Sequence, residues 1–171
     1  MQLFTMPSRR VGPNTSLVLF LHPYSGDSSW AASMFHLNHL VEQHDVVVLA
    51  PNGREDDLGL AYWLGGDSFS GYFLGKASDG SDTPEMVQKY LTDYRMQHDI
   101  TEQAQYEILA RHNFDIHYVT EVMAYAKRTF PSIQPNRTYL FGSGMGADLA
   151  LLLACNMSDA FAAVISHNGE S

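Results

Sequence analysis

Four short apolar runs constrain the fold of this 171-residue chain more than any other feature. They occupy residues 17–21, 46–50, 138–141 and 162–166. Each is rich in aliphatic residues, none alternates with polar residues, and a histidine, glycine or asparagine follows closely. Runs of this kind are typical of strands that are buried on both faces of a parallel sheet.

Helical spacing fills the segments between these runs. Apolar residues three and four positions apart predict helices over 29–43, 114–129 and 144–155. We expect Ser28 or Ser29 to cap the first helix and Asn113 to cap the second. An alternation of strand and helix predicts an α/β fold, a three-layer sandwich around a mostly parallel sheet.

The stretch from about residue 65 to 112 breaks this alternation. It opens with glycine, serine and aspartate in a loop-like composition, and a helix start at Thr83-Pro84-Glu85 follows. A second helix is expected near 102–111. We interpret the stretch as an insertion above the sheet within a single domain that covers residues 1–171.

Composition narrows the classes of function. With 10 basic and 19 acidic residues the formal net charge is −9, which argues against a nucleic-acid partner and a polybasic membrane anchor. Cys155 is the single cysteine, so neither an internal disulfide nor a cysteine-built zinc site is expected. No apolar run approaches the roughly 18 residues of a membrane span, and no secretory signal pattern is present, which favours an intracellular location. His36 and His39 lack a neighbouring carboxylate, and we expect no metal or cofactor.

Two strand ends carry the chemistry of the sequence. LFLHPYSGDSSW spans residues 19–30, and TYLFGSGMGADLALLLAC spans residues 138–155. Between them come Pro51-Asn52-Gly53, Trp63 and Asp115, in that order. This series resembles the α/β-hydrolase superfamily, and within it the polyhydroxybutyrate-depolymerase and feruloyl-esterase-like branch. The resemblance covers about residues 15–169 and implies an α/β-hydrolase fold.

The resemblance places a G-x-S-x-G turn at residues 142–146. In such a turn a serine nucleophile stands at a sharp strand-to-helix corner between small residues. Gly142 and Gly146 match the outer glycines, but the middle position is Gly144, which has no side chain to attack a carbonyl. With Ser143 in the middle, the two outer positions that need small residues would be the large Phe141 and Met145, and Ser143 would point one residue early, so we do not expect it to take over as the nucleophile.

The resemblance also implies that an acid and a histidine follow the nucleophile after further strands. Ser171 is only 27 positions past Gly144 (171 − 144 = 27), so we read the chain as a truncated, incomplete α/β-hydrolase domain. The backbone N–H groups of Tyr24 and Met145 would remain as a vestigial oxyanion hole.

These features predict a non-catalytic, esterase-like pseudoenzyme that serves as a structural or binding subunit of a larger assembly. His22, Ser143 and Trp63 are the candidate binding residues, with a small ester or carboxylate as ligand. A protein partner or a second copy is expected to cover the sheet edge near 162–166. The alternative is a carboxylic ester hydrolase with a serine acyl-transfer mechanism, seen as a partial or nucleophile-disabled chain.

Overall fold

The computed structural model of the chain describes residues 3–7, 11–55, 59–63, 92–93, 95–97, 99, 101, 104 and 113–169. Most of the predicted insertion at about 65–112, including the proposed helix start near Thr83, lies outside these residues. The prediction of an insertion therefore remains a prediction.

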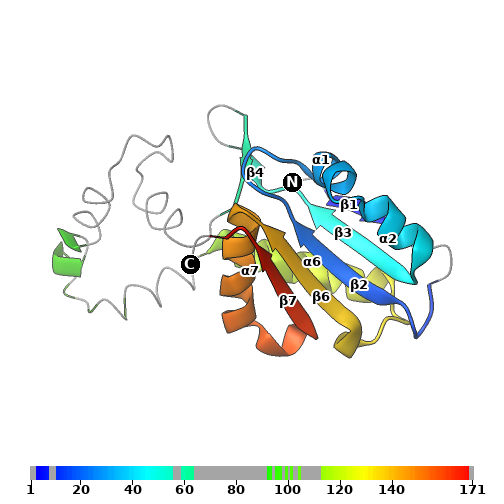
Figure 1. Ribbon diagram of the computed structural model, residues 1–171. Coiled ribbons are helices and arrows are strands. Elements are labelled where there is room, and N and C mark those ends of the chain that lie inside the picture. The colour runs from blue at the N-terminus through cyan, green and yellow to red at the C-terminus, as the bar shows by residue number, and fades with distance from the viewer. Residues whose placement is uncertain are drawn as a thin grey trace.

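A five-stranded sheet forms the centre of the fold (Figure 1). In spatial order its strands are β1 (Leu3–Met6), β3 (Val46–Pro51), β2 (Ser16–Leu21), β6 (Thr138–Ser143) and β7 (Ala163–His167). β1 is antiparallel to β3, and the other neighbouring pairs are parallel. The four apolar runs thus become β2, β3, β6 and β7, and the predicted mostly parallel sheet is confirmed.

Helices cover both faces of this sheet. One face carries α1 (Ser28–Met34) and α2 (Leu37–Gln43), and the other carries α6 (Phe114–Thr129) and α7 (Met145–Asn156). Alternate residues of β3 enter two separate cores: Val47 and Leu49 pack with α6 and α7, whereas Val48 and Ala50 pack with α1 and α2. The three-layer sandwich predicted from the sequence is therefore confirmed.

Short elements complete the described part. They are β4 (Arg54–Glu55), β5 (Ala61–Tyr62) and the 3-10 helices η1 (Pro135–Arg137) and η2 (Ser158–Ala160). β4 and β5 pair antiparallel as a separate two-stranded ribbon. Among the described residues, no helix combines the length and apolar character needed to cross a membrane.

The single helix predicted over 29–43 is wrong, because the chain breaks into α1 and α2. His36 sits at the break with a left-handed φ of +50°, a conformation that ends one helix and redirects the next. The predicted serine cap is also wrong. Asp27 caps α1 instead, and its carboxylate accepts a hydrogen bond from the Trp30 N–H at 2.7 Å.

The predicted helix over 114–129 is confirmed as α6. The Asn113 side chain accepts hydrogen bonds from the N–H groups of Asp115 and Ile116, at 2.9 and 3.4 Å. Val119, Val122 and Ala126 then form its buried face. Local capping and apolar spacing agree here, which explains why the sequence predicts this helix so closely.

The expectation that all four runs are buried on both faces is wrong for β7. Its residues are mostly exposed, and the Ile165 side chain is 58% exposed. β7 pairs only with β6 and forms the edge of the described sheet. An edge strand lacks a neighbour on one side, so apolar composition alone does not bury it.

Candidate functional site

The turn between β6 and α7 is the most constrained corner of the backbone. Gly144 adopts φ +53° and ψ −126°, a conformation that residues with a side chain rarely adopt. Its N–H donates to the carbonyl oxygen of His167 at 2.9 Å, which ties the corner to the end of β7. The chain therefore leaves β6 sharply and enters α7 within one residue.

Two glycines allow α7 to approach the sheet at this corner. A Cβ atom at Gly142 would collide with the carbonyl oxygen of Gly146, and one at Gly146 would collide with the carbonyl oxygen of Leu21 in β2. Only a residue without a side chain fits at either position. The predicted small-residue requirement at 142 and 146 is thus a matter of direct backbone contact.

Pro23 packs against the corner from the loop that follows β2. A Cβ atom added to Gly144 would lie 3.0 Å from the Cβ atom of Pro23 and 3.5 Å from its Cα atom. The shorter separation is tighter than ordinary van der Waals contact, so the proline ring would have to shift by a few tenths of an ångström to accept a side chain at position 144. Pro23 therefore packs closely beside the corner.

His22 lies at the end of β2 and is fully buried. Its Nε2 accepts a hydrogen bond from the Gly53 N–H at 2.8 Å, which leaves Nδ1 as the protonated nitrogen that donates to the carbonyl oxygen of Pro23 at 2.8 Å. Burial lowers the pKa of the imidazole below its usual value of 6.5. With both nitrogens engaged, neutral His22 holds two loops together.

The Pro51-Asn52-Gly53 turn serves the same framework. The Asn52 side chain accepts a hydrogen bond from the Ser28 N–H at 2.7 Å, and Gly53 packs directly against the backbone of Tyr62. Trp63 is fully buried and donates its indole N–H to the carbonyl oxygen of His22 at 3.0 Å. The structure thus places Trp63 inside the framework, rather than on an open binding surface.

Sequence reasoning missed a serine–imidazole pair. Ser143 and His167 are aligned neighbours on β6 and β7, and the Ser143 Oγ atom lies 3.2 Å from the His167 Nδ1 atom. Ser143 is 5% exposed, whereas His167 is exposed and has the Phe35 ring 5.9 Å from its own ring. The carboxyl ends of adjacent parallel strands lie at the same end of a sheet. Since Ser143 and His167 each closely follow a predicted strand, the sequence could have predicted that they lie close together.

A buried carboxylate, also matched to the family pattern, lies in the first turn of α6. The Asp115 Oδ1 atom is 3.4 Å from the Arg54 Nε atom, and Asp115 is fully buried. The Arg54 guanidinium also lies 4.8 Å above the Phe114 ring. This ion pair joins β4 to the start of α6, and the burial of Asp115 keeps its carboxylate away from solvent.

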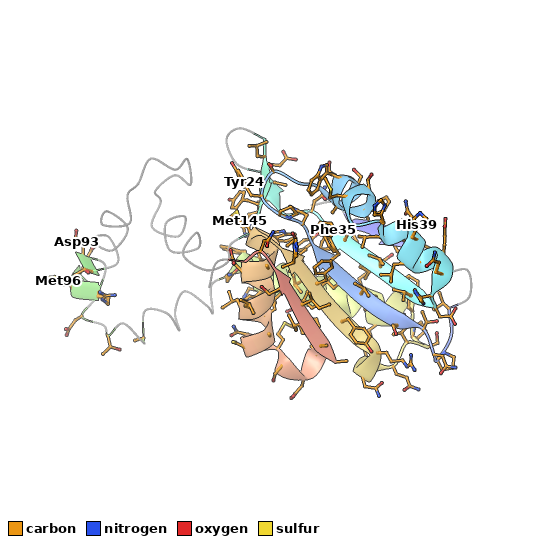
Figure 2. All side chains as sticks on the ribbon, in the orientation of Figure 1. Tyr24, Phe35, His39, Asp93, Met96 and Met145 are labelled. Carbon is orange, nitrogen blue, oxygen red and sulfur yellow. The ribbon has the colours of Figure 1, made fainter. Side chains whose placement is uncertain are left out.

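The predicted oxyanion residues lie at the same end of the sheet. Figure 2 labels Tyr24 and Met145 there, Tyr24 in the loop after β2 and Met145 at the first position of α7. The first N–H groups of a helix have no partner within that helix. The Met145 N–H is therefore a donor at the positive end of the α7 dipole.

No metal centre emerges from the described residues. Within the ranges that the structure places, no three His, Cys, Asp or Glu side chains gather in a way that could hold an ion. His39 lies on α2 and His36 is the residue before that helix; their rings lie 6.0 Å apart, edge to face.

Comparison with known proteins gives the fold. No protein-family model matches the sequence, and no curated protein matches it. Among solved structures it is similar to an acetyl xylan esterase from Aspergillus awamori (TM-score 0.59, 12% identity), covering 99% of this chain and 47% of that one. It is also similar to the esterase PE8, with a TM-score of 0.56 and 17% identity over 99% of this chain and 65% of that one. A Bacillus cereus carboxylesterase gives a TM-score of 0.56 and 13% identity over 100% of this chain and 64% of that one.

The chain has the α/β-hydrolase fold. Its mixed sheet, its helices on both faces and its sharp β6–α7 corner agree with that architecture. It spans about half to two thirds of the length of the solved structures named above, so it represents only part of their fold.

Proposed function

We propose that this chain is a non-catalytic member of the α/β-hydrolase superfamily, of the polyhydroxybutyrate-depolymerase and feruloyl-esterase-like branch. It would act as a binding or structural subunit that takes a small ester or carboxylate at the β6–α7 corner. The observation that carries the proposal is Gly144. It occupies the strained corner between β6 and α7, where a G-x-S-x-G turn would present its serine.

The surroundings of Gly144 support this assignment. Pro23 occupies the space beside the corner, and His22 uses both ring nitrogens in framework hydrogen bonds. Neither residue is arranged to activate a hydroxyl group at position 144. What remains at the corner is a backbone donor, the Met145 N–H, which suits a carbonyl or carboxylate oxygen.

Amide chemical shifts test the binding half of the proposal. Titration of the chain with butyrate should shift the Met145 and Gly146 amide resonances in a saturable way. Proline is tolerated at the first position of a helix, so Met145→Pro removes one donor and keeps α7, and butyrate should bind it more weakly. Titration with butanol controls for the apolar part of the ligand. Absence of saturable shifts at the corner contradicts carboxylate binding there.

A second function is favoured by the Ser143–His167 pair, which could make the chain an ester hydrolase after all. In that reaction Ser143 Oγ would attack the ester carbonyl while His167 Nδ1 takes the serine proton. The 3.2 Å separation of the two atoms suits this step. Two features oppose it: Ser143 is buried within β6, and His167 has no ion pair with a carboxylate among the described residues.

Hydrolysis of p-nitrophenyl acetate separates the two functions. Exposed histidines react slowly with this ester, so the comparison that decides is between the native chain and Ser143→Ala. Equal rates in the two proteins support the non-catalytic proposal. A rate that falls at least tenfold in both Ser143→Ala and His167→Ala, with unchanged circular dichroism, overturns it in favour of the hydrolase.

A further inference from the structure

A cavity lies at the opposite end of the strands from the corner. It is lined by Leu17 near the start of β2 and by Thr138 at the start of β6. The corner begins at the other end of β6, about 16 Å away at roughly 3.3 Å per strand residue. The cavity is therefore a site separate from the corner at Gly144.

The cavity opens to solvent and is close in size to a small-molecule site. Its volume is about 290 Å³, and half-buried residues such as Met123, Phe130 and Ile133 form part of its wall. Small-molecule sites begin at about 300 Å³. The cavity therefore has room for a flexible molecule of roughly ten heavy atoms.

The lining of the cavity is apolar with a single cation. Met123, Phe130 and Ile133 are among its apolar walls, and among the described residues that line it Lys127 on α6 is the only charged one. Lys127 is exposed and forms no ion pair within the described part of the chain. The aliphatic part of the Lys127 side chain can lie along the apolar walls while its ammonium group stays at the rim. This arrangement suits an amphipathic anion.

We propose that this cavity binds a medium-chain fatty acid, with the alkyl tail among the apolar walls and the carboxylate at Lys127. Octanoate, with ten heavy atoms, matches the volume. The net charge of −9 disfavours carboxylates at the surface of the molecule as a whole, so the ammonium of Lys127 favours this cavity as the place where an amphipathic anion binds. Methionine at the wall adapts its shape readily to an alkyl chain.

Calorimetric titration of the 171-residue chain with fatty acids below their micellar concentrations tests the proposal. Affinity should rise about fourfold per methylene from hexanoate to octanoate, the value expected for burial of each added CH₂ group. The affinity should level off beyond octanoate, when the cavity is full. Octanoate should bind more tightly than 1-octanol.

Variants separate the charge from the cavity. Lys127→Gln should weaken octanoate about fivefold, as expected for an exposed ion pair, and should leave 1-octanol unchanged. Lys127→Arg should retain the affinity for octanoate. Arg128→Gln, the next residue on α6, does not line the cavity and is the matched control, expected to change neither ligand. Ala124→Phe, which fills the cavity, should abolish both.

Three results overturn the proposal. One is no detectable octanoate binding by a chain that unfolds cooperatively. Another is equal loss of octanoate in Lys127→Gln and Arg128→Gln, which would indicate a general charge effect. The third is undiminished binding to a folded Ala124→Phe variant, which would place the ligand elsewhere. The chemical-shift changes that butyrate causes at Met145 do not depend on any of these three results. The proposed carboxylate binding at the β6–α7 corner is therefore tested separately.

Discussion

Pro23 and Gly144 fit together at the scale of single residues. The proline ring would lie in tight contact with a Cβ atom at position 144, and glycine tolerates the backbone conformation there. Because Gly144 has no side chain, the Pro23 ring can pack closely against it. A single substitution at either position therefore tests only half of the arrangement.

Gly144→Ser should lower the free energy of unfolding by about 1–3 kcal/mol, because a side chain at φ +53° is strained. Part of the loss should disappear when Pro23→Gly is added, since the glycine clears the ring from the new Cβ atom. Urea unfolding of the two single variants and the double variant gives the coupling energy. Strict additivity would contradict the proposed contact. Gly144→Ala separates the effect of Cβ from that of the hydroxyl.

His22 should make the stability of the chain depend on pH. Its pKa is lowered by burial, so the unfolded chain takes up a proton below about pH 6.5 while the folded chain resists it. The stabilisation is present above pH 6.5 and is lost as the pH falls toward the folded-state pKa. The loss is at most about 1.4 kcal/mol per pH unit in that window.

Chemical unfolding between pH 7 and pH 5 measures this dependence. His22→Gln should flatten the dependence even if it destabilises the chain at every pH. His44→Gln, which changes an exposed histidine, is the control and should keep the native slope. Identical slopes in all three proteins would contradict the role given to His22.

At the scale of elements, the contact between α7 and β2 sets the corner. Gly146 in the first turn of α7 lies against the carbonyl groups that end β2, so helix and strand meet backbone to backbone. Backbone atoms cannot rotate out of the way as a side chain can. The helix position is consequently fixed by the absence of a Cβ atom.

Gly146→Ala should lower the free energy of unfolding by about 2–3 kcal/mol, the range typical of an overpacked core. The loss should appear although alanine favours a helix interior by about 1 kcal/mol over glycine. Gly12→Ala is the matched control, because a Cβ atom at Gly12 meets nothing within 4 Å. Thermal or urea unfolding that ranks the two variants equally would contradict the close approach.

At the scale of the whole molecule, β7 has a neighbouring strand on one side only among the residues that the structure describes. Ile165 is exposed there, and the unpaired side of an edge strand presents backbone donors and acceptors. We propose that a second copy or another protein pairs with this edge. A binding subunit of a larger assembly would use such a surface.

Sedimentation analysis across a range of protein concentrations checks the edge. The native chain should associate as its concentration rises, and Ile165→Lys should weaken the association at least tenfold by placing a charge on the edge. Met34→Lys, at an equally exposed apolar residue on α1, should leave it unchanged. A native chain that stays monomeric at every concentration would contradict self-pairing.

Much of the fold could be predicted from local sequence. The four apolar runs correspond to β2, β3, β6 and β7, and α6 begins and ends where its cap and spacing predict. The break at His36 was not predictable, because the apolar spacing continues through it. The exposure of β7 depends on its place at the edge of the sheet, which spacing does not report.

The sequence by itself determined the alternation of strand and helix and the lack of a side chain at position 144, because both are properties of local residue order. Only the tertiary structure decided what surrounds that position. It brought Pro23 against Gly144, enclosed His22 between two loops and set Ser143 beside His167. These contacts join residues from different strands and loops, and their distances depend on how the strands align.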